Sequence, residues 1–385
     1  MPAPGFSTTS VDNRRLLVNT PVTQNIQLEV GAVSETISVS AEATQINTVD
    51  ATVGNTFGTK PVLQLPFEAR NVVGLLALQP GVTYAGDNLQ TSYRGGNVNG
   101  GKSDQANVTL DGVDVNDQQN RDPFTSVLRV TLDSVQEFRV VTTNANADQG
   151  RSSGAQIALV TKSGTNEVHG SAYWFVRNKI TNANSFFNNS AVSAQNPNGV
   201  PLAKLNRNIY GASMGAPIVK NRLFIFGNYE GRKDRREDSI LRVVPTATLR
   251  QGIVRYIRTD GSIATLTPQD LATKVDPLGI GPNQAALAVL NQYPLPNEAT
   301  AGDGINYSGF RFNAPVLFDS ATYIAKLDAY LDRESKHQAF IRGNLQDDKF
   351  QDVPQFPGLP PNNTNLQAPR GIAVGLNSVF SANKV

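Results

Sequence analysis

Residues 134–170 read SVQEFRVVTTNANADQGRSSGAQIALVTKSGTNEVHG, and the pattern changes at the end of this stretch. Before that point, short runs rich in Val, Thr, Ile and Phe (residues 137–142 and 155–161) alternate with clusters of Gly, Asn, Asp and Ser. This pattern predicts short strands joined by polar turns. After residue 170 we expect strands near ten residues long. The chain is therefore expected to contain two different β structures.

The first of these two β structures extends upstream of residue 134. Asp111-Gly112 lies between residues 107–110 and 113–115, and this pair predicts a hairpin because a type I′ turn needs φ > 0 at both central positions. Helices are expected at residues 60–65 and 67–78, separated by Pro66. The predicted core of this compact α+β unit consists of Val108, Leu110, Phe138, Val140, Ile157 and Leu159, beside Leu75, Leu76 and Leu78.

The second structure shows period-two alternation. In residues 321–332 every odd position is apolar, and the even face is mostly polar, which predicts a lipid-facing side and a wet side. Residues 337–346 repeat the pattern, and weaker versions occur at residues 170–178, 208–216, 222–230 and 371–382. Five side chains should form an exposed apolar band: Tyr323, Leu327, Leu331, Ile341 and Leu345.

The joins between these strands alternate in length. Residues 217–221 and 333–336 form short turns, while the other joins are long. A soluble sandwich also produces alternating strands, but short turns on one side and long loops on the other are typical of outer-membrane barrels. The predicted fold class is mainly β with a small α+β plug, followed by a partial outer-membrane β-barrel of about six antiparallel strands. So few strands cannot close, because the smallest membrane barrels have eight, and the first and last strands should have bare edges.

Composition excludes several classes of function. A length of 385 residues predicts two or more units. The net charge of +2, from 34 basic and 32 acidic residues, shows no nucleic-acid footprint. The absence of Cys excludes disulfides and thiolate chemistry, and no apolar run is long enough for a membrane-spanning helix. The start MPAPGFSTTS has no features of a signal peptide.

Candidate sites of chemistry are weak. Asp111, Asp114 and Asp117 do not have calcium-loop spacing, and Ser152 has no plausible His partner, so no catalytic residue, cofactor or metal is expected. The charged run at residues 232–238 is interpreted as a solvated rim, with lipopolysaccharide phosphate binding as the alternative. Tyr173 and Trp174 fit either an aromatic girdle or ordinary strand packing.

The N-terminal region contains two further strands. Residues 21–31 alternate so that Val22, Ile26, Leu28 and Val30 share one face, which predicts a half-buried strand. Residues 35–41 (ETISVSA) favour an extended conformation. They fit either an ordinary edge strand or a docking strand that adds to a partner's sheet.

Four stretches resemble TonB-dependent outer-membrane receptors of the Oar-like branch. They are VTQNIQLEVGAVSETISVSAEA (22–43), LPFEARNVVGLLALQPGV (65–82), YRGGNVNGGKSDQANVTLDGVDVND (93–117) and SVQEFRVV onward to YWFVRN (134–178). The resemblance implies a carboxypeptidase-regulatory-like tail at residues 1–34, a TonB box and linker at 35–50, a plug at 51–165 and the N-terminal part of the barrel at 166–385.

The resemblance also implies a function without bond chemistry. TonB, with its ExbB/ExbD energy complex, would grip the TonB box, and the ligand would bind the plug apices. The implied box is Glu35, Thr36, Ile37, Ser38, Val39, Ser40 and Ala41, expected to be mobile and at most loosely paired with the plug. The implied ligand-binding residues are Arg94, Asn97, Asn99, Asp117 and Asn120.

The expected function is energy-coupled uptake of an unidentified small-molecule, glycan or peptide ligand across the outer membrane. Outer-membrane lipid is a further expected partner, and the plug and N-terminal tail would face the periplasm. The alternative is a surface binding or adhesion module with the same scaffold and no active transport. Because related receptors close a barrel of twenty-two strands, this chain is expected to be the front portion of a receptor.

Overall fold

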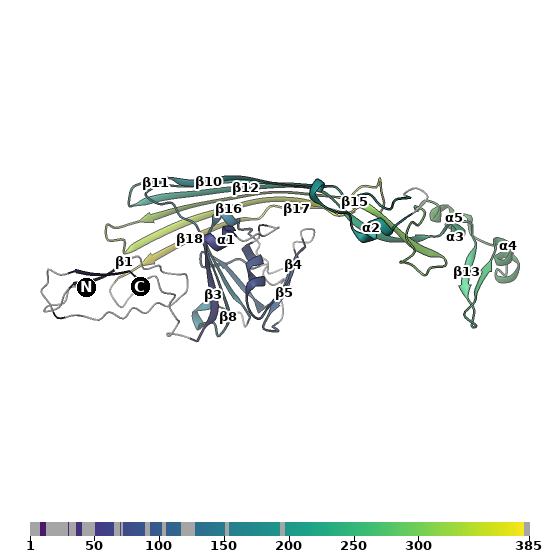
Figure 1. Ribbon diagram of the computed structural model, residues 1–385, viewed down its shortest axis with the longest axis horizontal. Coiled ribbons are helices and arrows are strands. Elements are labelled where there is room, and N and C mark those ends of the chain that lie inside the picture. The colour runs from purple at the N-terminus through teal and green to yellow at the C-terminus, as the bar shows by residue number, and fades with distance from the viewer. Residues whose placement is uncertain are drawn as a thin grey trace.

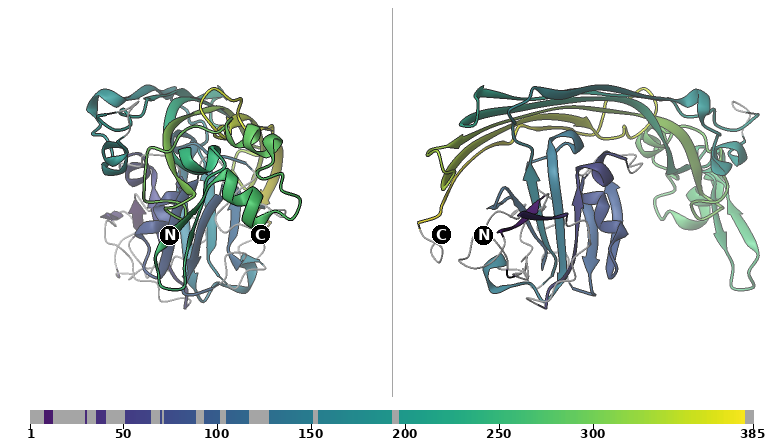
Figure 2. Two further views of the ribbon diagram at one scale, coloured as in Figure 1. Left: turned by 90° about the vertical axis from the view of Figure 1, so that its right-hand side faces the viewer. Right: turned by 60° about the vertical axis from the view of Figure 1, so that its left-hand side comes forward.

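The computed structural model describes residues 8–12, 30, 36–40, 51–64, 70, 72–88, 93–101, 105–116, 128–150, 154–192 and 197–380. Two β-sheets account for most of the chain. A curved large sheet runs along the long axis of the molecule, and a small sheet lies on its concave side (Figure 1). Figure 2 shows the strands of the small sheet crossing beneath those of the large sheet.

The small sheet has five strands in the order β3-β8-β9-β6-β7. Its strands are β3 (Val53–Gly58), β6 (Asn107–Leu110), β7 (Val113–Asp114), β8 (Val135–Thr143) and β9 (Gln156–Thr161). The pairing of β6 with β9 is parallel and the others are antiparallel, so the sheet is mixed. The β6–β7 turn places Asp111 at φ 49° and Gly112 at φ 81°, which confirms the expected hairpin.

Short helices and one hairpin cover the small sheet. They are α1 (Thr59–Gln64), the 3₁₀ helices η1 (Val72–Leu78), η3 (Leu132–Ser134) and η4 (Ala147–Gln149), and the hairpin β4 (Val82–Asn88) with β5 (Tyr93–Val98). Eight of the nine predicted core residues are buried, but Leu78 is 54% exposed. Leu78 is the last residue of η1, and the turn that follows it buries Gln79 instead.

The large sheet contains seven strands in six positions. They are β10 (His169–Asn178), β11 (Leu205–Val219), β12 (Leu223–Pro245), β15 (Tyr307–Tyr330), β16 (His337–Gln351), β17 (Thr364–Gln367) and β18 (Arg370–Ser378). Both β17 and β18 pair with β16 in one continuous register, so they occupy the same position. The prediction of about six antiparallel strands is confirmed.

Two strands are much longer than the predicted ten residues. β12 has 23 residues and β15 has 24, and they pair along their whole length. At about 3.3 Å per residue they reach about 75 Å, well beyond an apolar band about 25 Å tall. They therefore extend well past the length of such a band and support the segment between them at the far end of Figure 1.

That distal segment has its own small elements. They are α3 (Ala247–Arg250), β13 (Val254–Ile257), β14 (Ile263–Leu266), α4 (Pro268–Asp270), the π-helical turn η6 (Leu271–Val275) and α5 (Gln284–Leu290). Between β10 and β11 lie η5 (Lys179–Thr181) and α2 (Phe186–Ser190). In the described part of the chain, no helix has the length and apolarity needed to cross a membrane.

The two faces of the large sheet differ as strand alternation requires. Tyr323, Leu327, Leu331, Ile341 and Leu345 all lie exposed on the outer face, which confirms the predicted band. The opposite face is not wet along its length, because the small sheet buries Thr322 and Lys326. Tyr173 and Trp174 separate accordingly: the Tyr173 hydroxyl donates to Glu230 on the inner face, and Trp174 is 70% exposed on the outer face.

The charged run at residues 232–238 is a solvated rim only in part, because its inward-facing residues Arg232 and Asp234 are buried. It lies within β12, where even-numbered residues face inward and the run is divided between the two faces. Asp234 is fully buried and pairs with Arg207 at 2.7 Å and with Arg232 at 2.6 Å. These charges are predicted to form a rim because the strand at residues 222–230 is expected to end before them, whereas β12 continues to Pro245.

The N-terminal region contributes a separate two-stranded sheet. β1 (Thr8–Asp12) and β2 (Thr36–Ser40) pair in parallel, with Thr8 opposite Thr36. Of the predicted strand at residues 21–31 only Val30 is described, and it is 86% exposed instead of half-buried. Val22, Ile26 and Leu28 lie outside the described residues.

Candidate functional site

The interface between the small and large sheets concentrates charged and hydrogen-bonding side chains. One apolar cluster fills the small sheet and its covering segments, from Val62 to Leu159. Among the described residues, that cluster includes no side chain of the large sheet. Most of the contacts between the two sheets are ion pairs and hydrogen bonds, although Phe226 and Ile324 on the inner face of the large sheet are buried as well. We call this contact region the inter-sheet interface.

The first group of contacts surrounds Asp111 at the tip of the β6–β7 hairpin. Its carboxylate lies 2.7 Å from Nε of Arg342 and 3.8 Å from Nζ of Lys326, both on the inner face of the large sheet. The backbone N–H and the hydroxyl of Thr161 donate to the same carboxylate at 2.9 and 2.8 Å. Arg342 also donates to the carbonyl of Leu110 at 3.2 Å, so the hairpin is fixed by both side chain and backbone.

The second group surrounds Arg70, in the segment before η1. Its guanidinium pairs with Asp133 at 2.5 Å and with Glu230 at 3.3 Å. It also lies 4.5 Å from the centre of the Tyr173 ring, a cation–π contact. Nearby, burial lowers the pKa of Lys162, against the opposing attraction of Asp133. Arg70 thus links η3, which covers the small sheet, to the large sheet.

The third group lies nearer the distal end. Arg129 pairs with Asp348 at 2.9 Å, and its backbone N–H donates to Gln346 at 2.8 Å. The hydroxyl of Thr131 donates to Asn228 at 2.7 Å. The three partners in this group, Asp348, Gln346 and Asn228, are all buried, so these contacts are shielded from solvent.

This geometry can be compared with known proteins. The family model described as outer membrane beta barrel domain matches residues 160–385, more than half of the chain. The chain belongs to this family. It is accordingly an outer-membrane protein, with the outer face of the large sheet toward lipid.

Two similar proteins extend the comparison. The TonB-dependent transporter Oar of Myxococcus xanthus is 24% identical over 234 residues, which cover 56% of this chain and 20% of that protein. The crystal structure of the outer membrane transporter YddB from Escherichia coli matches with a TM-score of 0.52 and 12% identity, covering 85% of this chain and 37% of that one. The sequence resemblance to Oar-like TonB-dependent receptors and the predicted fold class are thereby confirmed. The chain spans about a fifth of the length of Oar.

Two of the predicted ligand-binding residues of this outer-membrane barrel protein lie on the β4–β5 hairpin, and a third lies at its base. Arg94 is in β5 near the β4–β5 tip, opposite Asp87, and Asn97 is opposite Thr83. Asn99 lies at the base instead, at φ 50°, and its amide donates to the Thr142 carbonyl and the Thr143 hydroxyl, both at 2.9 Å. Asn99 therefore attaches the hairpin to β8.

The remaining predicted site residues are only partly described. Asp117 and Asn120 lie outside the described residues, as do Glu35 and Ala41 at the ends of the predicted TonB box. Thr36, Ile37, Ser38, Val39 and Ser40 form β2, whose partner is β1. This partner lies outside the predicted plug, so the mobility of the segment and its loose pairing with the plug stay predictions.

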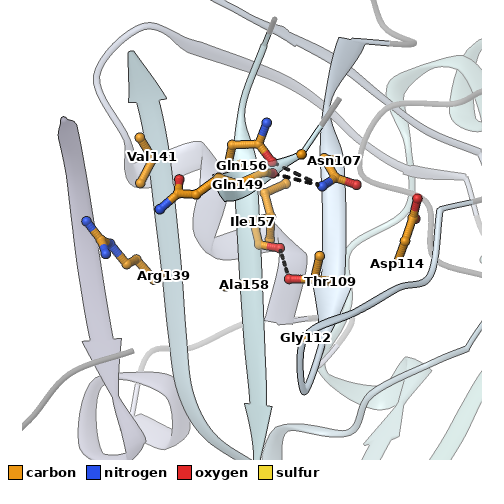
Figure 3. A pocket seen from close by; sticks show the side chains of 11 residues that line it. Asn107, Thr109, Gly112, Asp114, Arg139, Val141, Gln149, Gln156, Ile157 and Ala158 are labelled. Atoms are coloured by element: carbon orange, nitrogen blue, oxygen red, sulfur yellow. Dashed lines mark hydrogen bonds between the residues drawn. The ribbon is translucent and has the colours of Figure 1, made fainter. Parts of the chain in front are cut away.

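A polar pocket of about 480 Å³ lies on the small sheet (Figure 3). The Asn107 amide donates to the Gln156 side chain at 3.1 Å and to the Gln149 carbonyl at 3.4 Å. The Thr109 hydroxyl donates to the Ile157 carbonyl at 3.3 Å. The polar side chains that line this pocket thus use much of their hydrogen-bonding capacity on one another and on neighbouring backbone carbonyls.

A second pocket, of about 620 Å³, lies where β12 and β15 project beyond the apolar band. Lys179, Leu202, Glu237, Phe310 and Phe312 are among its lining residues. Beside it, Arg311 pairs with Glu298 at 2.5 Å, and this hydrogen bond holds the pKa of Glu298 below its ordinary value. The pocket is on the side of the long joins between the strands of the large sheet.

Sequence reasoning missed most of the inter-sheet interface. It interpreted Asp111 only as a turn former, and it treated Lys326 and Arg342 as members of a wet face. The signal was present, because Lys326 and Arg342, at even positions of β15 and β16, require buried partners once that face is covered. No group of three or more His, Asp or Glu side chains in the described part of the chain is placed to bind a metal ion.

Proposed function

We propose that this chain forms the plug and the first barrel strands of a TonB-dependent outer-membrane transporter. In this proposal the small sheet, with residues 51–165, is the plug domain, and residues 166–385 begin the barrel. The similarity to the M. xanthus transporter Oar supports this assignment. The observation that supports it most directly is the polar inter-sheet interface.

A plug must be stable as a unit and yet be movable relative to the barrel. An apolar interface would make separation expensive, because apolar surface exposed to water costs about 25 cal/mol per Å². Charged side chains regain hydration and other partners when they separate, so a polar contact is better suited to repeated opening. Asp111, Arg70 and Arg129 each contact the large sheet in this way.

The mechanism follows from this arrangement. An external ligand, which is a small molecule, a glycan or a peptide, binds the loops and the plug hairpin that contains Arg94 and Asn97. TonB, energised by its ExbB/ExbD complex, pairs with residues 35–41 by strand addition. Force on that segment displaces the small sheet from Arg342 and Lys326, and the ligand passes through the barrel. No covalent bond changes, so no catalytic residue is involved.

The proposal predicts that the chain binds the TonB C-terminal domain through residues 35–41. Ile37→Pro should abolish retention in a pull-down, because proline removes a backbone N–H and fixes φ. The control is Ala299→Pro, in an exposed bend of the distal segment. Equal retention of Ile37→Pro and the unmodified chain would exclude this segment as the TonB box and would favour the adhesion module.

A further inference from the structure

The outer face of the large sheet ends its apolar band in a row of aromatic side chains. Trp174 on β10 lies opposite Tyr210 on β11, and Tyr229 on β12 lies opposite Tyr323 on β15. The Tyr210 and Tyr229 ring centres are 6.2 Å apart, and those of Tyr229 and Tyr323 are 4.8 Å apart. Tyr and Trp gather where hydrocarbon meets headgroups. This row therefore locates the boundary on the side of the long joins.

Charged side chains begin on the same face just beyond this row. Because every second residue of a strand faces the same side, Lys233 follows Tyr229 outward, Asp319 follows Tyr323, and Lys349 lies next in line on β16. The register places Asp319 directly opposite both Lys233 and Lys349. The two lysines are two strand spacings apart, about 10 Å.

The carboxylates in this row are already engaged by arginines. Arg235 forms a bidentate pair with Asp319 at 2.7 and 2.9 Å, and Arg370 pairs with Asp347 at 2.8 Å. Among the described residues, neither Lys233 nor Lys349 forms an ion pair, and both side chains are exposed. Four cations against two carboxylates leave an excess of positive charge at headgroup depth.

We propose that Lys233 and Lys349, with Arg235 and Arg370 beside them, bind the phosphate groups of outer-leaflet lipid. This outward row is continuous with the lipid-facing side chains of Ile225, Leu327 and Ile341, and it points away from the small sheet. A soluble ligand bound there could not reach the interior of the barrel. A phosphorylated lipid would place its acyl chains along the apolar band and its phosphate beside the lysines. The inference rests on membership of the barrel family and is independent of the proposed transport.

The test compares two lipids on the purified full chain. The chain is equilibrated in detergent micelles containing equal phosphatidylcholine and phosphatidic acid, and the retained lipid is measured by mass spectrometry. Phosphatidic acid should be enriched. The variant Lys233→Gln/Lys349→Gln should lower the enrichment about fivefold for each lysine removed, and Lys233→Arg/Lys349→Arg should restore it.

The matched control removes two lysines at the opposite end of the band, Lys220→Gln/Lys336→Gln, and should leave the enrichment within about twofold. Trp174, the single tryptophan of the chain, reports whether each variant keeps its strands, because its emission should not change. An equal loss in the control variant would show non-specific attraction and overturn the proposal. So would unchanged enrichment in Lys233→Gln/Lys349→Gln, or complete displacement of the lipid by inorganic phosphate, which would indicate a site for free phosphate.

Discussion

The interior of the small sheet and the inter-sheet interface are both buried, but they are built from opposite chemistry. The interior is apolar, with Val108, Phe138 and Ile157 almost inaccessible to solvent. The interface buries Arg342 and Asp111 instead, as an ion pair. Apolar packing is non-directional and strong in sum, whereas a buried ion pair gains little net stability over an apolar contact. Under the proposed function, the apolar interior is the part that remains intact and the interface is the part that separates.

The largest effect should come from the apolar interior. Phe138→Ala removes a fully buried ring between β3 and β9, and it should destabilise the small sheet by about 4 kcal/mol. Hydrogen exchange of the β8 and β9 amides would measure this loss, with the β15 and β16 amides as the internal reference. If protection of β15 and β16 fell by the same amount, the two regions would be one cooperative unit and the contrast would be wrong.

The interface should respond differently to single and double changes. Asp111→Asn leaves Arg342 buried without its carboxylate, which should cost about 3 kcal/mol. Adding Arg342→Met removes the unpaired charge and should recover most of that loss. The measurement is exchange of the amides in β6 and β7. Recovery in the double variant would show that the pair positions the small sheet without providing net stability, and equal losses in both variants would contradict this.

Local sequence patterns were enough to predict each sheet separately. Alternation located the outward side chains of β15 and β16, and Asp111-Gly112 located the hairpin, because these features depend on neighbours a few residues apart. The pairing of Asp111 with Arg342 joins positions 231 residues apart, and no local pattern reports it. The charged run at residues 232–238 lies between these two extremes, because a local pattern could have predicted its orientation but was not followed far enough. Continuing the alternation from Phe224 would have placed Arg232 and Asp234 inward, but the strand was expected to be ten residues long.

A smaller effect is expected in the link that joins the small sheet to the large sheet. Gly164 lies in the link between β9 and β10, and a Cβ there would come within 2.4 Å of the Ile225 carbonyl oxygen and 2.7 Å of that of Ala216. Gly164→Ala should therefore cost about 1–3 kcal/mol, since both neighbours are backbone atoms that cannot rotate away. Gly227→Ala, where a Cβ meets nothing within 4 Å, is the matched control. Thermal unfolding of both variants in detergent would test the claim, and equal midpoints would refute it.

The smallest effect should arise outside both regions, in the turn between β15 and β16. Backbone N–H groups of Lys336, His337 and Glu334 donate to the Asp332 carboxylate and hold its pKa below the ordinary value. A carboxyl group whose pKa is lower in the folded chain stabilises the fold above its unfolded pKa of about 4 and loses that contribution as the pH falls through the folded value. Amide exchange in residues 331–337 should therefore accelerate, relative to the rest of β15, as the pH is lowered below about 4. Asp332→Asn removes the titrating group, so its turn should show no such step, while the amides around Asp111 behave alike in both chains. A pH step of the same size in Asp332→Asn would mean that another group controls this turn.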